Sequence, residues 1–259
     1  MGVLTGFNEL DRILEGGLQN GSLYLLAARP AMGKTGFALN IIGNICLKDY
    51  RSAVIFSLEM SKKQLVERFL SLEAGLDINK LRKGQLEGDD WDLLIKGAQS
   101  MKESKLIIDD TEGISVSQIR NKCIQYKEQN ADLSAVFIDY LQLVSTNGSY
   151  DSRKEEMYAV ANELKQLAKD LDLPIFVLSQ LSRFTEQRSD HRPMLADLRD
   201  MGGIDKTGDV IMFLYRDGYY DMDTDKKDIA EVIVAKNTLG AVGCLELKYS
   251  PQIIKFENI

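Results

Sequence analysis

The stretch LLAARPAMGKTGFALN, residues 25–40, decides how the rest of the sequence is interpreted. An apolar run that ends at Ala28 predicts a buried strand, a tight loop follows, and a helix is predicted to begin around Gly33. This order fits the phosphate-binding loop G-x-x-x-x-G-K-[ST], with Ala28 in place of the first glycine, better than a plain turn before a helix. Glycine lets the backbone curl around phosphate oxygens, which a helix N-terminus attracts. The predicted nucleotide-binding residues of this loop are Arg29, Pro30, Ala31, Met32, Gly33, Lys34, Thr35 and Gly36.

A hydrolytic site also needs a carboxylate near magnesium and a group that activates water. Lys34 is expected to neutralise the β and γ phosphates, and the Thr35 hydroxyl to bind Mg²⁺. Asp139 ends the apolar run SAVFID and Glu59 follows VIFSL, so each is predicted at a strand end. Such carboxylates often only cap helices, but two of them beside a phosphate loop favour catalysis. We predict Lys34 and Glu59 as catalytic, and Thr35 and Asp139 as Mg²⁺ ligands.

Short apolar runs alternate with amphipathic helices over the first two thirds of the chain, which is typical of a parallel sheet covered on both faces. The predicted strands are Ser22–Ala28, Ser52–Leu58, Lys105–Ile108, Ala135–Asp139 and Pro174–Ser179. One helical stripe consists of Met157, Val160, Ala161, Leu164, Leu167, Ala168 and Leu171. Another helix is predicted to begin at Ser61, with Gln64 completing a capping box, and to end near Gly75.

After Val210 the pattern changes to strands joined only by turns, which predicts antiparallel or hairpin-linked pairing. The four runs are VIMFLYR, AEVIVAKN, GCLELKYS and QIIKFEN. The predicted fold class is therefore α/β, with a mostly parallel central sheet and a C-terminal antiparallel extension, in one domain over residues 1–259.

Composition predicts an ordinary soluble globular protein, with 44% apolar and 27% charged residues among 259. No run approaches the roughly 18 apolar residues that a membrane helix needs, so no membrane partner is expected. Three cysteines, odd in number and far apart, argue against a disulfide framework or zinc cluster and for the cytoplasm. A net charge of -7 does not favour nucleic-acid binding, but a few basic loops are compatible with it.

Six segments occur in an order that carries a resemblance: ARPAMGKT, FSLEM, IDYLQL, LSQLSRFTEQRSDHRP, DLRDMGGID and IMFLYRDGYY. Together they resemble the motor domain of the DnaB-type replicative helicases over essentially the whole chain. Other RecA-like ATPases share the phosphate loop but are not expected to contain the segment from SQL to DLR. The resemblance implies a RecA-like fold and a hexameric ring around single-stranded DNA, with each ATP between two subunits.

The resemblance also assigns residues that their own chemistry does not single out. Gln180, in LSQL, resembles a polar sensor that reports the γ-phosphate to the DNA loops, and Arg68 matches an arginine near the nucleotide. The loop LRDMGG implies sequence-independent contacts to DNA phosphates through Arg199, Asp200 and Gly202. Without the family likeness, these residues would be a strand-end amide, a solvated helix charge and an exposed loop.

The hairpin VAKNTLGAVG, residues 234–243, matches a family turn that enters the ATP site of the adjacent subunit. Lys236 occupies the position of the family lysine and is predicted to bind nucleotide in trans. Two places later, Thr238 stands where the family carries an arginine that stabilises transition-state charge. An ordinary hairpin therefore remains an alternative, as does compensation by Arg216 or by a partner.

The predicted function is an ATP-dependent helicase motor that translocates on single-stranded DNA during replication. The alternatives are a RecA-like ATPase of recombination or remodelling, and a weakly hydrolysing nucleotide-binding ring scaffold. In the full-length family, primase and a helicase loader are partners, and a separate N-terminal domain binds primase. No segment here corresponds to that domain, so the chain is expected to be either an excised motor domain or a shorter relative, with a ring that is weak or concentration-dependent.

Overall fold

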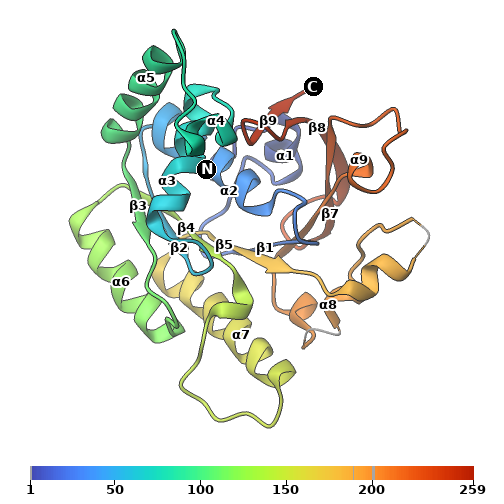
Figure 1. Cartoon of the computed structure of the whole chain (residues 1–259). Coiled ribbons are helices and arrows are strands. Elements are labelled where there is room, and N and C mark those ends of the chain that lie inside the picture. The colour runs from blue at the N-terminus through green and yellow to red at the C-terminus, as the bar shows by residue number, and fades with distance from the viewer. Residues whose placement is uncertain (1, 189, 200–201) are drawn as a thin grey trace.

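The computed structural model describes residues 2–188, 190–199 and 202–259. Nine strands in these residues form one sheet in the order β3-β2-β4-β5-β1-β6-β7-β8-β9 (Figure 1). The strands are β1 (Leu23–Ala28), β2 (Ser52–Ser57), β3 (Leu106–Asp109), β4 (Leu133–Asp139), β5 (Ile175–Gln180), β6 (Val210–Tyr215), β7 (Ile229–Asn237), β8 (Gly243–Ser250) and β9 (Lys255–Asn258).

Helices occupy most of the connections between the strands. The α-helices are α1 (Asn8–Ile13), α2 (Lys34–Gly43), α3 (Lys62–Ala74), α4 (Ile78–Lys83), α5 (Asp90–Glu103), α6 (Val116–Gln129), α7 (Arg153–Leu171), α8 (Ala196–Arg199) and α9 (Asp217–Tyr220). Shorter turns of helix are η1 (Asn44–Lys48), η2 (Leu141–Leu143), η3 (Arg183–Gln187) and η4 (Ile204–Lys206).

The sheet has a parallel part and an antiparallel part, as the sequence predicted. Every pairing from β3 across to β6 is parallel, and β7, β8 and β9 continue the same sheet in antiparallel order. Because β1, β2, β4 and β5 run in one direction, their carboxyl ends meet at one edge, which is where open α/β sheets bind ligands.

Alternate residues of each buried strand face two different hydrophobic clusters. Tyr24 and Leu26 of β1 pack in the cluster that contains α2 and α3, whereas Leu23 and Leu25 pack in the cluster that contains α6 and α7. Figure 1 shows these two helix pairs on opposite sides of the sheet. Burial on both faces explains why the strands are almost continuously apolar in sequence.

The two helices that the sequence described in detail are confirmed. All seven residues of the predicted stripe are buried along α7. At the start of α3, the Ser61 side chain accepts from the backbone of Gln64 and the Gln64 side chain accepts from the backbone of Ser61. The helix ends at Gly75, which has the left-handed conformation that an L side chain resists.

Three local predictions were wrong. The last strand begins at Lys255, because residues 252–254 form part of a turn between β8 and β9. The connection between β6 and β7 contains α9 and is longer than a turn. The polar composition of residues 183–203 predicts a loop, whereas the described residues of this segment contain η3 and α8. Short helices of this kind have too few residues for a periodic pattern to be recognised.

In the part of the chain that the structure describes, none of the helices combines the length and the apolarity required to cross a bilayer.

A buried asparagine connects the helix of the phosphate loop to the far edge of the sheet. The Asn40 side chain is 7% exposed and lies on α2. Its amide donates to the carbonyls of Gly36, at 2.8 Å, and Ile254, at 2.9 Å, and its oxygen accepts from the Phe256 amide at 3.0 Å. These bonds satisfy buried backbone groups of α2, of the turn before β9 and of β9 itself, so the position of α2 depends on them.

We therefore expect Asn40→Leu to lower the free energy of unfolding by about 2–4 kcal/mol, because it leaves buried backbone groups unpaired at about 1–3 kcal/mol each. Asn79→Leu, at an exposed position of α4, is the control and should change stability by less than about 0.5 kcal/mol. Urea denaturation of both variants measures the difference. Equal effects would show that the Asn40 amide does not stabilise this contact.

Candidate active site

The phosphate loop connects β1 to α2 at the carboxyl edge of the sheet. Gly33 precedes α2 with φ of 103° and Ala31 has φ of 61°, so the chain turns through two left-handed residues. A Cβ at Gly33 would lie 3.2 Å from Phe256 Cζ. Both the left-handed backbone conformation and this close contact therefore disfavour any residue with a side chain at this position. The first helical bond runs from Phe37 N–H to the Gly33 carbonyl, which leaves the amides of the first turn without intrahelical acceptors. Such amides are an anion-binding group.

A cavity of about 380 Å³ lies over this loop, large enough for a nucleotide. Every residue predicted for the phosphate loop lines it except Met32, whose side chain is 1% exposed and packs in the core. Glu59, Arg68 and Gln180 line it as well. The structure thus brings residues that follow β1, β2 and β5 into one cavity.

The metal-binding pair predicted from sequence is in direct contact. Thr35 Oγ1 donates to Asp139 Oδ2 at 2.6 Å. Asp139 is 1% exposed, and burial raises the pKa of its carboxyl, which the hydrogen bond from Thr35 opposes. Among the described residues, no group of three or more His, Cys, Asp or Glu side chains is arranged to bind a metal ion. A hydroxyl and one carboxylate instead suit Mg²⁺, which keeps several waters and binds substrate phosphates.

Basic side chains dominate the walls of the cavity. Arg29, Lys34, Arg68 and Arg82 line it, with Glu59 as a carboxylate among them. Burial lowers the pKa of the Lys34 ammonium and of the Arg68 guanidinium, because both charges are removed from water. Arg68 Nε is buried and has no hydrogen-bond partner in the described part of the chain. An anionic ligand would supply the missing partners.

An aromatic and aliphatic wall of the cavity, beside the phosphate loop, was missed by sequence reasoning. It is formed by Tyr249 and Ile254, with Ile78 from α4. The Arg216 guanidinium stacks 4.5 Å from the centre of the Tyr249 ring, and its Nη1 donates to the Ala31 carbonyl at 3.4 Å. The turn between β8 and β9 carries no motif, and only pairing in the sheet brings it to the loop. No sequence signal predicted this aromatic and aliphatic wall.

Lys236 and Arg199 are not among the residues that line this cavity. Lys236 Nζ donates to the carbonyls of Asp205, at 2.8 Å, and Lys206, at 3.2 Å, within its own chain. The Arg199 side chain is 70% exposed, with its Nε 3.5 Å from an Asp205 carboxylate oxygen. Asp200 lies outside the described residues. Lys236 and Arg199 therefore both contact η4, a relation that the sequence did not reveal.

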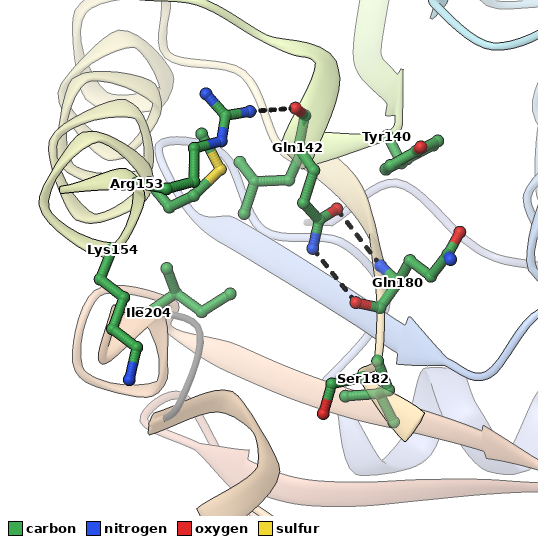
Figure 2. Close-up of a pocket in the computed structure, with 10 residues that line it drawn as sticks. Tyr140, Gln142, Arg153, Lys154, Gln180, Ser182 and Ile204 are labelled. Atoms are coloured by element: carbon green, nitrogen blue, oxygen red, sulfur yellow. Dashed lines mark hydrogen bonds between the residues drawn. The ribbon is translucent and has the colours of Figure 1, made fainter. Parts of the chain in front are cut away.

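A second cavity, of about 470 Å³, lies beside the end of β5 (Figure 2). Its lining includes Gln142, Arg153, Lys154 and Ile204. Gln180 lines this cavity and the nucleotide-sized cavity, so the end of β5 is the wall between them.

Comparisons with known proteins agree with this geometry. The replicative DNA helicase DnaC of Bacillus subtilis is 46% identical over all of this chain, and the replicative DNA helicase DnaB of Geobacillus stearothermophilus is 44% identical. The chain spans 57% of the length of each of these relatives.

Solved structures show the same fold. One ATPase domain matches with a TM-score of 0.96 and 38% identity, covering 100% of this chain and 92% of that one. A DnaB-like replicative helicase, described with its interactions with primase, matches with a TM-score of 0.96 and 38% identity, and 62% of that chain is covered. The expected RecA-like class is thereby confirmed. Since the sequence model of the family also matches residues 2–258, this chain belongs to the DnaB-like helicase C-terminal domain family.

Proposed function

We propose that this chain is an ATP-dependent DNA helicase motor. The observation that carries the proposal is the bond from Thr35, which lines the basic cavity over the phosphate loop, to the buried carboxylate of Asp139. Phosphoryl transfer requires positioning and charge stabilisation more than covalent chemistry, and this cavity offers both.

The phosphates of ATP would lie along the first turn of α2. The amides of the loop and the Lys34 ammonium would bind the phosphate oxygens, and Arg68 would pair with a charge there. Mg²⁺ held by Thr35 and, directly or through water, by Asp139 would neutralise charge that develops on the transferred group. A bound anion would offset the loss of hydration of the buried Lys34 ammonium, and a bound cation would do the same for the buried Asp139 carboxylate.

Glu59 is the proposed general base. It stands two residues beyond Ser57, which pairs with Asp139 in the parallel register of β2 and β4. Glu59 is exposed on the cavity wall, so its carboxylate is free to accept a proton from the attacking water. The nucleobase would lie against Tyr249 and Ile254, where an aromatic face stabilised by Arg216 favours stacking.

Arg199 and the backbone near Gly202, together with Asp200, are the proposed contacts to DNA phosphates. Arg199 is exposed and positively charged, as a contact independent of base sequence requires. By analogy with the replicative helicases that this chain resembles, we propose action during replication as a hexameric ring in the cytoplasm, with primase and a loader as partners.

Lys236 and Thr238 are proposed to reach the ATP site of a neighbouring copy. The backbone N–H of Thr238 donates to the Asp209 carbonyl at 2.9 Å. The residue is exposed, and this bond does not involve its side chain. Lys236 would have to exchange its bonds to η4 for a phosphate, or approach the neighbour while keeping them.

Glu59→Gln is expected to lower the turnover of ATP by about 10²–10⁴-fold, because the amide cannot accept the proton of the attacking water. The affinity for a fluorescent ATP analogue should stay within about twofold, since no phosphate contact is removed. Steady-state phosphate release and equilibrium titration measure the two quantities. Glu112→Gln, at an exposed position away from the cavity, is the control; if both variants lost turnover equally, Glu59 would not be the base.

Thr238→Arg is expected to raise ATP turnover in the presence of single-stranded DNA by at least about tenfold, because an arginine supplied in trans contributes about 10³–10⁵ in related enzymes. Lys236→Ala should lower turnover, whereas Lys248→Ala, at an exposed position of β8, should not. The rates are measured with and without oligothymidylate over a range of protein concentrations. A gain that persists in the monomer would contradict action in trans, and absence of any DNA stimulation in the unaltered chain would contradict the motor.

A further inference from the structure

The Gln142 side chain takes the place of a missing strand at the end of β5. The last residue of β5 paired with β4 is Val177, opposite Ile138, so β5 continues beyond its neighbour. There the Gln142 amide oxygen accepts from Gln180 N–H at 3.3 Å, and its Nε2 donates to the Gln180 carbonyl at 3.2 Å. The backbone N–H and C=O of one residue, Gln180, are thus both paired with one side-chain amide, as they would be with a strand (Figure 2).

This pairing also involves the buried side chain next to Gln180. Gln142 Nε2 lies 3.0 Å from Ser179 Oγ, and Ser179 is 0% exposed. On the opposite edge, β5 pairs with β1 up to Ala28, the residue before the phosphate loop. The end of β5 is therefore held on one side by the strand that leads into the phosphate loop and on the other by Gln142.

The backbone of Gln142 contacts the start of α7. An Arg153 guanidinium nitrogen donates to the Gln142 carbonyl, as Figure 2 shows. Arg153 is the first residue of α7, so this bond joins η2, which follows the Asp139 strand, to the N-terminus of that helix.

The first turn of α7 in turn supports the loop of Arg199. A Cβ placed on Gly202 would lie 2.2 Å from the Lys154 carbonyl oxygen, so the loop backbone rests directly on the helix. Gly202 has φ of 97°, and its N–H donates to the Arg199 carbonyl at 3.3 Å. Gly202 therefore lies on the backbone of Lys154, the residue that follows Arg153 in sequence.

We propose that Gln142 is a positioning residue that couples the nucleotide cavity to the loop of Arg199 and Gly202. Its side chain holds the backbone of Gln180, which lines the nucleotide cavity, and its carbonyl holds Arg153, beside the Lys154 carbonyl under Gly202. This inference rests on the proposed function, because it requires that ATP and single-stranded DNA bind to the two ends of the contact series.

The physical basis is that one residue carries contacts in both directions. A shift of Gln180 when nucleotide binds would move the Gln142 amide, because two hydrogen bonds join that amide to the backbone N–H and C=O of Gln180. Since η2 is short and Gln142 is its central residue, movement of the side chain is transmitted to its carbonyl and hence to Arg153. Coupling of this kind is reciprocal: DNA must tighten nucleotide binding by the same factor as nucleotide tightens DNA binding.

The test compares the unaltered chain with Gln142→Met, which keeps the side-chain length and removes the donors and the acceptor. A fluorescent non-hydrolysable ATP analogue is titrated with and without oligothymidylate, and labelled oligothymidylate with and without the analogue, both with Mg²⁺. In the unaltered chain each ligand should tighten the other by about 5–150-fold, a typical range for coupled sites. In Gln142→Met the coupling factor should fall below about twofold, while each ligand alone binds within about twofold of its original affinity.

Gln166→Met is the matched control, because Gln166 is an exposed glutamine of α7 whose amide bonds Asp170. Its coupling factor should be unchanged. If Gln142→Met does not fold, Arg153→Met removes the next contact from a side chain that is 55% exposed and should lower the coupling factor as well.

Two results would overturn the inference alone: coupling in Gln142→Met equal to that in Gln166→Met, or weaker binding of one ligand with the coupling factor preserved. If the unaltered chain bound the analogue but did not bind oligothymidylate at all, the proposed function would be contradicted, and the inference with it.

Discussion

The contact between Thr35 and Asp139 requires that two strands end at the same edge of the sheet. Thr35 is the second residue of α2, which follows β1, and Asp139 ends β4, with β5 between these strands. Parallel pairing through β5 brings both ends together, and helices on both faces bury the carboxylate. The raised pKa of Asp139 and the lowered pKa of Lys34 follow from that burial. Two buried groups of opposite charge, next to the free amides of the first turn of α2, are what the proposed metal and phosphate site requires.

The antiparallel extension has a role beyond completing the core. Its turn between β8 and β9 brings Tyr249 and Ile254 against the phosphate loop, and Asn40 fixes that turn to α2. Its other end places Lys236 against η4, next to the loop of Arg199. One sheet therefore supports both the wall of the nucleotide cavity and the segment proposed to bind DNA. Communication between them needs only short steps through β5, η2 and the start of α7.

Sequence reasoning succeeded where a residue's neighbours along the chain set its role. The phosphate loop, the stripe of α7 and the capping box of α3 are local patterns, and the structure contains each of them. Local reasoning failed for Met32, because it did not distinguish a loop residue facing the ligand from one facing the core. It also missed η3, α8 and α9, whose few residues show no periodicity, and the start of the last strand, where Ile254 adopts a left-handed conformation in a turn.

By itself, the sequence determined the α/β class, the position of the phosphate loop, and the carboxylates at the carboxyl ends of β2 and β4. Each of these depends on hydrophobic period and on residue type at a strand end, which are properties of a short segment. Only the tertiary structure decided that Tyr249 and Arg216 stack beside that loop, that Lys236 bonds its own η4, and that Gln142 replaces a strand at the end of β5. Those contacts join segments far apart in sequence, and they arise from strand order and register, which no single segment encodes.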